Sequence, residues 1–273
     1  MTATTEPAAP DYDALYAAFD SPLMRQLREQ AYGEDIGQHS WVTADELRAD
    51  LERLSISASS RLLDLGCGPC GPLVFALRRT ACTGTGLEAS AAALASGQAR
   101  ADAAGVGKRI ELLHTDLDLP LPCRSASFDA AIAFDVVLHL RDRKAFFDEV
   151  ARVLVANGKF LFTDAAVVCG AISNLEVGLR SMNSYAQFAP PGFNERLLAA
   201  SGFRLIGTED RTASVLRNAG GRLRAMLAHR AALEAAQGAQ AFARQQHYLE
   251  TVVALAERGA LARVMYLAER SVP

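Results

Sequence analysis

The sequence is poor in lysine, lacks long apolar runs and has no strong excess of either charge. The only lysines are Lys108, Lys144 and Lys159, and the net charge is -3. A chain without a broad basic surface is poorly suited to grip a nucleic-acid backbone. A membrane span needs roughly 20 consecutive apolar residues, and no stretch approaches that length. We therefore expect neither a nucleic-acid nor a membrane partner.

Cysteine is also scarce. The five cysteines stand at positions 67, 70, 82, 123 and 169. A structural zinc site needs a second close pair of Cys or His residues, so we expect no metal. Residues 1–10 lack the basic and apolar regions of a signal peptide. We expect them to form a disordered leader of a cytoplasmic protein with reduced thiols. The abundance of alanine and arginine is typical of a GC-rich bacterial genome.

The chain is long enough for one large α/β domain, or for one domain with a helical appendage. It has 273 residues, of which 50% are hydrophobic. Apolar residues at four-residue spacing predict one helix over 11–31. Thr43 and Glu46 form a capping box, which predicts a second helix from there to about Leu54.

From residue 61 the pattern changes to alternating strands and helices. Strands are predicted at 61–65, 83–87, 109–114, 128–137 and 159–163, and helices at 72–79, 90–104 and 142–155. Strands that are apolar throughout indicate a parallel sheet covered on both faces. An irregular segment (170–192), a helix (193–201), a strand (203–208), long helices (213–260) and a last strand (263–268) follow.

These patterns predict a cap, a core and an insertion. We expect an N-terminal helical cap over 11–58 and a cofactor-binding core over 59–168. Residues 169–273 would complete the core and carry a helical lid insertion at about 213–260.

The stretch after the first predicted strand, LDLGCGPCGP, allows two interpretations. Gly66, Gly68 and Gly71 have the spacing of a loop that holds a nucleoside-bearing cofactor, and Glu88 at the end of the next strand can accept hydrogen bonds from ribose hydroxyls. Cys67 and Cys70 have the spacing of a redox pair, which needs a thiol of lowered pKa. The position between a strand and a helix favours the cofactor loop. The redox interpretation predicts an exposed, reactive pair.

At this point the chain resembles a known family. The segments LLDLGCGPCGP, GLEAS, HTDLDLPLPCRSASFDAAIAFDVVLHL and RVLVANGKFLFTDA are similar, in this order, to class I S-adenosylmethionine-dependent methyltransferases of the bacterial small-molecule type. The resemblance implies a doubly wound, Rossmann-like, seven-stranded sheet with an antiparallel last strand. It also implies S-adenosylmethionine as cofactor and S-adenosylhomocysteine as product. Pro69, Cys70 and Asn157 depart from the commoner residues of the family.

The resemblance also implies roles for residues that match the family pattern. Asp64, Gly66, Cys67 and Gly68 would lie along the methionine part of the cofactor, Glu88 and Ala89 at the ribose, Asp116 and Leu117 at the adenine, and Phe134 and Asp135 near the transferable methyl. The segment around Gln38, His39, Ser40 and Trp41 resembles one that closes over the cofactor. For Trp41, burial in the core is an equal alternative.

Methyl transfer from a sulfonium needs positioning more than a catalytic motif. His139 follows the fourth strand and is the candidate general base, with a helix-entry structural role as its alternative. Candidate acceptor contacts are Tyr16, Tyr185, Phe188 and His247, and the acceptor is expected to be small and apolar or aromatic. For Arg211, Arg217, Arg222 and Arg224 a solvated helix face is favoured over an acidic acceptor.

The function predicted from the sequence is methyl transfer to a small molecule in natural-product biosynthesis, by a monomer or homodimer. A cyclase or pericyclase that binds the same cofactor without transferring methyl is the alternative. A non-enzymatic binding module is disfavoured because Gly66, Gly68, Glu88 and Asp116 are all present.

Overall fold

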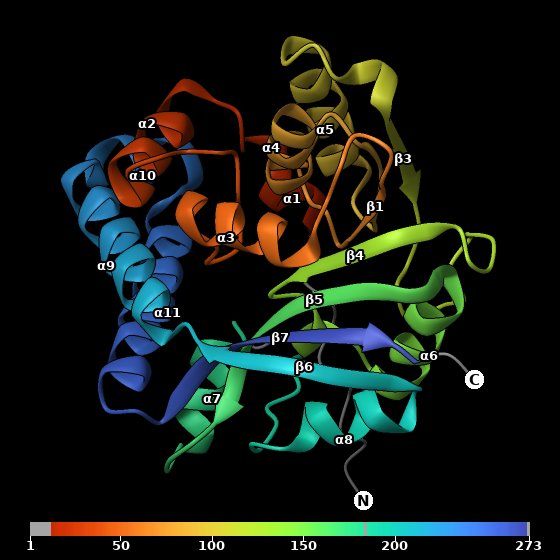
Figure 1. Ribbon diagram of the computed structural model, residues 1–273. Helices are drawn as coiled ribbons and strands as arrows, with labels where there is room; N and C mark the ends of the chain where they lie inside the picture. Colours follow the sequence, from red (N-terminus) through yellow and green to blue (C-terminus); the bar gives the residue numbers. More distant parts are fainter. Residues whose placement is uncertain (1–11, 183–184, 272–273) are drawn as a thin grey trace, which may run out of the picture.

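The chain folds around one mixed seven-stranded sheet. The structure, a computed structural model, describes residues 12–182 and 185–271, so the leader expected at 1–10 lies outside it. The strand order is β3-β2-β1-β4-β5-β7-β6 (Figure 1). The strands are β1 (Arg61–Leu65), β2 (Thr83–Glu88), β3 (Ile110–His114), β4 (Phe128–Phe134), β5 (Leu154–Val168), β6 (Phe203–Asp210) and β7 (Leu261–Arg270).

The predicted fold class is confirmed. β1 to β5 pair in parallel, and β7 runs antiparallel to both β5 and β6. β5 and β7 are both longer than the pattern predicted, because they pair with each other from Lys159 and Glu269 to Val168 and Leu261. Parallel strands bring their carboxyl ends to one edge of the sheet, which is where open α/β sheets bind ligands.

Helices cover the two faces of the sheet. On β1, Leu62 packs into the core formed with α3 (Ala44–Leu54) and α4 (Gly71–Thr80), and Leu63 packs into the opposite core with α6 (Arg143–Val153) and α8 (Phe193–Ala200). This alternation follows from the two-residue period of a strand. α5 (Ala91–Ala103) contributes Ala101 to the first core. Two short 3₁₀ turns, η1 (Gly107–Arg109) and η2 (Val137–His139), complete this part.

The single helix predicted over 11–31 is wrong in one respect. The segment forms two helices, α1 (Tyr12–Ala17) and α2 (Pro22–Tyr32). Ser21 caps the second helix by accepting a hydrogen bond from the Met24 N–H at 3.3 Å, and Pro22 occupies its first turn. Proline is tolerated at a helix start but would interrupt a continuous helix. Apolar spacing alone did not reveal this break.

A group of helices lies beyond the carboxyl ends of the parallel strands. α2, α9 (Thr212–Ala228), α10 (Arg230–Gln237) and α11 (Ala239–Glu257) gather at that end of the sheet in Figure 1. Their apolar residues form one cluster with Trp41. The helical region predicted at 213–260 is thus three helices, which meet at His229 and Gly238. The segment 170–192, expected to be irregular, contains α7 (Asn174–Arg180), which begins at a Ser173 capping box.

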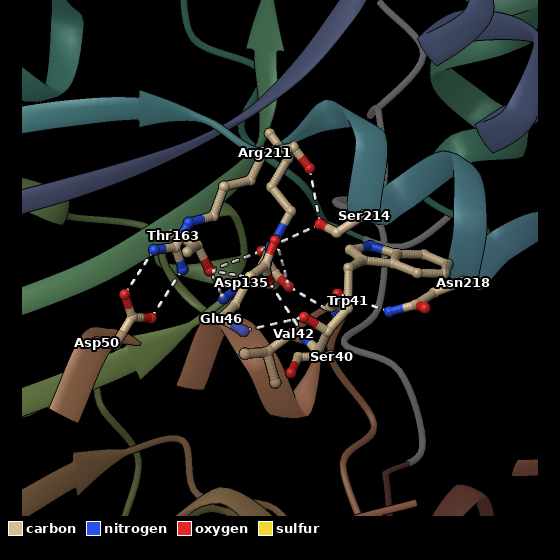
Figure 2. A network of polar contacts seen from close by, with 12 residues as sticks. Ser40, Trp41, Val42, Glu46, Asp50, Asp135, Thr163, Arg211, Ser214 and Asn218 are labelled. Atoms are coloured by element: carbon tan, nitrogen blue, oxygen red, sulfur yellow. Dashed lines mark hydrogen bonds and ion pairs between the residues drawn. The ribbon is translucent and has the colours of Figure 1, made fainter. Parts of the chain in front are cut away.

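A buried arginine on β7 connects the cap, the sheet and these helices. The Arg263 guanidinium donates to Asp135 after β4 at 2.8 Å, to Glu46 on α3 at 2.9 Å and to the Ser214 hydroxyl on α9 at 3.0 Å. Asp135 in turn accepts the backbone N–H of Trp41 at 2.9 Å. Figure 2 shows this network around Asp135. Three segments that are distant in the sequence are therefore held at one point.

Two further buried ion pairs support the same arrangement. Arg211 at the start of α9 donates twice to Asp50 on α3, at 2.5 and 2.7 Å. Arg143 on α6 donates to Asp164 on β5 at 2.6 Å. The expectation of a solvated Arg211 is therefore wrong: its side chain is buried because it carries the ion pair that attaches α9 to α3. No helix in the described ranges is both long enough and apolar enough to cross a bilayer.

We predict that Arg263→Leu strongly destabilises the fold. Removing one partner of a buried ion pair leaves uncompensated charge, here on Asp135 and Glu46, and costs about 3–5 kcal/mol. Urea unfolding of both proteins measures the change in the free energy of unfolding. Arg204→Leu is the matched control, because Arg204 is an exposed arginine paired with Glu269, also across β7, and exposed pairs are worth about 1 kcal/mol or less. Equal losses in the two variants would contradict a central role for Arg263.

Candidate active site

The glycine loop lies between β1 and α4 and is tied to the end of β2. Gly66 and Cys67 both donate backbone N–H groups to the Leu87 carbonyl, at 2.8 and 3.0 Å. Gly66 has φ +73°, and a Cβ there would come within 2.6 Å of the Val136 side chain. Gly68 donates its N–H to one oxygen of Glu88 at 2.9 Å, and Ser90 donates to the other. Only glycine fits Gly66, because a side chain there would be strained and would collide with Val136.

Asp64, on β1 just before the loop, has a buried carboxylate that is incompletely bonded. One of its oxygens, Oδ2, has no hydrogen-bond partner in the described chain. Burial, and to a lesser extent the negative charge of Glu88, raises the pKa of Asp64 to about 8. A buried polar atom without a partner is costly, so such an atom at a strand end points to a ligand that supplies the donor. A cationic ligand group would fit this oxygen.

The residues predicted for ribose and adenine lie at the same edge of the sheet. Glu88 at the end of β2 stands in register with His114 at the end of β3, and His114 Nε2 lies 2.8 Å from the Ala89 carbonyl. The exposed Asp116 and the buried Leu117 follow β3. A carboxylate oxygen has more than one acceptor position, so Glu88 can hold the loop and still accept a ribose hydroxyl. The roles of Glu88, Asp116 and Leu117 in binding a cofactor stay predictions.

Asp135 occupies the end of β4, after the buried Phe134, but its carboxylate is already engaged. The residue has φ +58°, in the left-handed region that few non-glycine residues adopt. Its carboxylate accepts hydrogen bonds from the Arg263 guanidinium, the Thr163 hydroxyl and the Trp41 N–H. Figure 2 shows Asp135 beside Thr163 and Trp41. We infer that Asp135 acts on the site by positioning the Trp41 segment.

The connector before α3 is braced internally by Gln38. Its side-chain oxygen accepts the Ile36 N–H at 2.9 Å, and its side-chain nitrogen donates to the Val42 carbonyl at 3.4 Å. Gly37 packs so closely against Gly71 on α4 that a side chain at position 71 would collide with it. The Ser40 carbonyl lies 3.5 Å from the Tyr32 hydroxyl. The buried Gln38 amide thus shapes the connector.

Tyr16, Phe19 and His39 form an aromatic cluster over the glycine loop. The Tyr16 ring lies 5.8 Å from Phe19 and 5.5 Å from His39, centroid to centroid. The Tyr16 hydroxyl would be 3.1 Å from a Cβ placed on Gly68. Burial, followed by the charge of Arg222, lowers the pKa of His39 to about 3. His39 is therefore a neutral imidazole at physiological pH.

On the other side of the strand end, Trp41 and Tyr248 form a stack. Their centroids are 6.4 Å apart with an interplanar angle of 22°. The Asn218 side chain donates to the Trp41 carbonyl at 2.8 Å. Trp41 is buried in the cluster with α9 and α11, which is the core position that the sequence left as an alternative. Tyr248 is not among the contacts predicted from the sequence. The helical phase of α11 turns Tyr248 toward Trp41 and leaves the candidate His247 exposed.

His139 lies in η2, directly after β4. Its side chain is accessible to solvent, yet protein atoms surround it closely, and this desolvation together with the nearby charge of Arg180 lowers its pKa to about 4. Among the other candidates, Tyr185 packs beneath the Arg141 guanidinium at 5.2 Å. Phe188 packs against Leu255 and Leu261, at the start of β7. The structure thus brings His139 close to Arg180, but it gives His247 no contact with the other site residues.

The paired cysteines are buried beneath the loop. Cys67 and Cys70 are unoxidised, with their sulfurs 3.5 Å apart. The Cys67 sulfur sits over Gly86 and the Cys70 sulfur over Gly97, each where a glycine leaves room. The hydrogen bond from Cys70 and burial raise the pKa of Cys67. This is the reverse of what a redox thiol needs, so the redox interpretation is not supported.

We predict that neither of these thiols reacts readily in the folded protein. Titration of the native chain with an aromatic disulfide reagent should modify the exposed Cys169 quickly, and Cys67 and Cys70 only after unfolding. Mass spectrometry of the labelled peptides identifies the site, and Cys169→Ala should remove the fast phase. Rapid labelling of Cys70 in the native chain would contradict the packing described here.

Two further features lie outside the strand-end site. A surface hollow lined by Arg48, Phe75 and Arg79, among others, includes only Gly71 of the predicted cofactor loop. Within residues 12–182 and 185–271, no group of three or more His, Cys, Asp or Glu side chains is arranged to hold a metal ion.

Comparison with known proteins identifies the core. Residues 63–162 match a family model described as a methyltransferase domain. Methyltransferase GfsG of Streptomyces halstedii is 33% identical over 116 residues, which cover 42% of this chain and 41% of GfsG. O-methyltransferase resE of Aspergillus sclerotiorum is 27% identical over 216 residues, which cover 76% of this chain and 81% of resE. The match to GfsG thus spans less than half of that protein.

Solved structures share the whole fold. The [4+2]-cyclase SpnF superposes with a TM-score of 0.78 and 21% identity, over 98% of both chains. The match includes the helices beyond the strand ends as well as the sheet.

The motif order, the strand order with its antiparallel β7 and the matched methyltransferase domain agree with one another. S-adenosylmethionine is the cofactor of this domain. Residues 63–162 are thus a methyltransferase domain of the class I, S-adenosylmethionine-dependent type.

Proposed function

We propose that this chain transfers the methyl group of S-adenosylmethionine to an oxygen or nitrogen atom of a small acceptor with an apolar or aromatic body, in natural-product biosynthesis. The observation that carries the proposal is the glycine loop with the unpaired, buried Asp64 oxygen beside Glu88. The O-methyltransferase resE, which aligns with most of this chain, supports an oxygen as the atom that is methylated.

The residues at the strand ends fit the cofactor. Asp64 would accept the ammonium of its methionine part, Glu88 its ribose, and Asp116 its adenine amine. The glycine loop would let the cofactor approach the backbone closely. The cofactor supplies a sulfonium methyl that is already activated, so the protein has to orient the acceptor and exclude water. Tyr16 and His39 cover the loop and would contribute to that exclusion.

His139 is proposed as the group that takes the acceptor proton. It follows β4, beside Asp135, and its lowered pKa keeps it neutral at pH 7. A neutral imidazole in a closely packed site can accept a proton from a hydroxyl or ammonium held against it. The lone pair of the acceptor atom would then attack the methyl carbon as the bond from that carbon to sulfur breaks.

A cyclase that binds the same cofactor is the alternative, and the fate of the cofactor distinguishes it from a methyltransferase. The structural neighbour SpnF is a [4+2]-cyclase. A methyltransferase converts its cofactor to S-adenosylhomocysteine in step with product, whereas a cyclase leaves the cofactor unchanged. Chromatography of the cofactor after incubation with small hydroxylated and aminated aromatic compounds measures this directly. Acceptor turnover with unchanged cofactor would replace the proposal with the cyclase.

We predict that binding of S-adenosylmethionine at pH 7 releases a proton. Asp64 is mostly protonated in the free chain, because its pKa is about 8, and the ligand ammonium favours the carboxylate. Affinity should therefore rise with pH up to about 8 and then stop rising. Calorimetry at pH 7 in two buffers of different ionisation enthalpy counts the proton. Asp64→Asn should bind more weakly and lose the release. NAD is the control ligand and should not bind.

Tight binding without proton release would contradict the contact between Asp64 and the ammonium, while leaving the cofactor assignment in place. Absence of binding by both S-adenosylmethionine and S-adenosylhomocysteine would contradict the proposed function itself.

We predict that His139→Gln lowers kcat by about 10²–10⁴-fold, the usual contribution of a general base, without changing the affinity for S-adenosylmethionine. The pKa of His139 is about 4, so the imidazole stays neutral between pH 8 and pH 6. Protonation of His139 should therefore not lower the wild-type activity in that range. His229→Gln is the matched control on the helical insertion, where the His229 ring hydrogen-bonds to the Gln30 side chain at 3.2 Å. An unchanged kcat in His139→Gln would show that the acceptor reacts without this base.

A further inference from the structure

Arg180 differs from every other buried arginine in the described chain. Four of the five have a carboxylate within 3.0 Å: Arg28 with Asp35, Arg143 with Asp164, Arg211 with Asp50, and Arg263 with Asp135. Arg180, at the end of α7, is 6% exposed and has no ion pair with any described residue. Its charge is buried without a counter-ion.

The partners that Arg180 does have are neutral. One guanidinium nitrogen donates to the Ala165 carbonyl at 3.1 Å and another lies 3.5 Å from the Tyr248 hydroxyl. The guanidinium carbon also stands 5.6 Å from the Tyr248 ring centroid. Arg180 lines a small cavity whose other walls include the apolar residues Val215 and Val252. Burying a charge is expensive unless it is paired, so this position favours a ligand that carries the missing negative charge.

Arg222 is a second cation beside this aromatic stack, on the ring of Trp41. The Arg222 guanidinium lies 5.1 Å from the Trp41 centroid, and Trp41 stacks on Tyr248. Arg222 is half-buried and likewise forms no ion pair with a described residue; its polar partner is the Tyr32 hydroxyl. Two guanidinium groups thus flank one aromatic stack. The expectation of a solvated Arg222 is wrong, because packing on Trp41 draws the side chain inward.

The charges around this stack leave a positive region beside the predicted methyl position. The charge of Arg180 lowers the pKa of His139, and the charges of Arg222 and His139 lower the pKa of His39. Asp135 and Asp164 are the carboxylates that influence His139. Both already form ion pairs, Asp135 with Arg263 and Asp164 with Arg143. No described acidic side chain is left to neutralise Arg180.

We propose that the acceptor carries an anionic group, a carboxylate or a phosphate, that binds Arg180, with Arg222 contributing to the attraction. The apolar or aromatic body of the acceptor would then lie along Trp41 and Tyr248. This inference rests on the proposed function, because it places the acceptor at the strand end beside His139. It adds charge to an acceptor that the sequence alone described as apolar or aromatic. Arginine suits this role because its planar fork matches both carboxylate and phosphate.

The test compares anionic and neutral probes of similar size. Protein saturated with S-adenosylhomocysteine is titrated by calorimetry with benzoate, phenyl phosphate and benzamide, in a buffer without chloride. We expect at least one anion to bind at least about tenfold more tightly than benzamide, with a preference that weakens as salt is added. Benzoate against phenyl phosphate distinguishes carboxylate from phosphate. Equal binding of all three, or no binding of either anion, would overturn the proposal.

Two variants assign the effect to Arg180. Arg180→Met retains much of the apolar stem and should remove the preference for the anion, whereas Arg180→Lys should keep part of it. Arg217→Met is the matched control, because Arg217 is an exposed arginine on α9. An anion preference that survives in Arg180→Met would overturn the assignment. The wild-type comparison stands by itself if that variant does not fold.

The initial saturation step separates the two levels of inference. If the wild-type chain does not bind S-adenosylhomocysteine, the proposed function is contradicted. Normal binding of S-adenosylhomocysteine without an anion preference would contradict only the anionic acceptor.

Discussion

The shared ion pair of Arg263 is the constraint on which the site depends. One guanidinium serves two carboxylates, Asp135 and Glu46, and the excess negative charge is offset by N–H donors from Trp41 and Thr43. Nearly every polar atom of the cluster is therefore satisfied, which is the condition under which buried charge becomes tolerable. A shift of the cap, of the end of β4 or of β7 would leave a charge unpaired, and a shift of β5 or α9 would break a hydrogen bond to the cluster. The connector that carries His39 and Trp41 is fixed relative to the strand ends by this cluster.

Much of the fold could be predicted because it rests on local patterns. Apolar strands alternating with helices indicate a parallel sheet, and the capping box at Thr43 is present in the structure, with Glu46 N–H donating to the Thr43 hydroxyl at 3.1 Å. The break at Pro22 and the start of α7 at Ser173 depend on single caps within weak patterns, so apolar spacing did not reveal them. The glycine loop and Glu88 could be located because their spacing and position relative to the strands are themselves the signal.

The acceptor side of the site could not be predicted in the same way. Arg180 on α7 and Tyr248 on α11 come together only in the tertiary structure, and neither belongs to a recognisable motif. Whether an arginine is paired depends on which carboxylates are already taken, as Asp164 is by Arg143. The Cys-Gly-Pro-Cys segment is the opposite case, because its spacing is typical of a redox pair but the structure does not support redox chemistry there. Its two sulfurs fill the space above Gly86 and Gly97, so the spacing serves the packing of the loop against β2 and α5.

The two halves of the site have opposite electrostatic character, and this follows from which charges the fold neutralises. On the proposed cofactor side, Asp64 and Glu88 have no arginine partner among the described residues, so the region would attract a cation. On the proposed acceptor side, Arg180 and Arg222 have no carboxylate partner in the same part of the chain, so the region would attract an anion. A cofactor with a sulfonium and an acceptor with an anionic group would each bind where its charge is complementary, and would also attract each other. The charges of the Arg263 cluster pair with one another. The cluster can therefore fix the positions of the two halves without cancelling the electrostatic field of either.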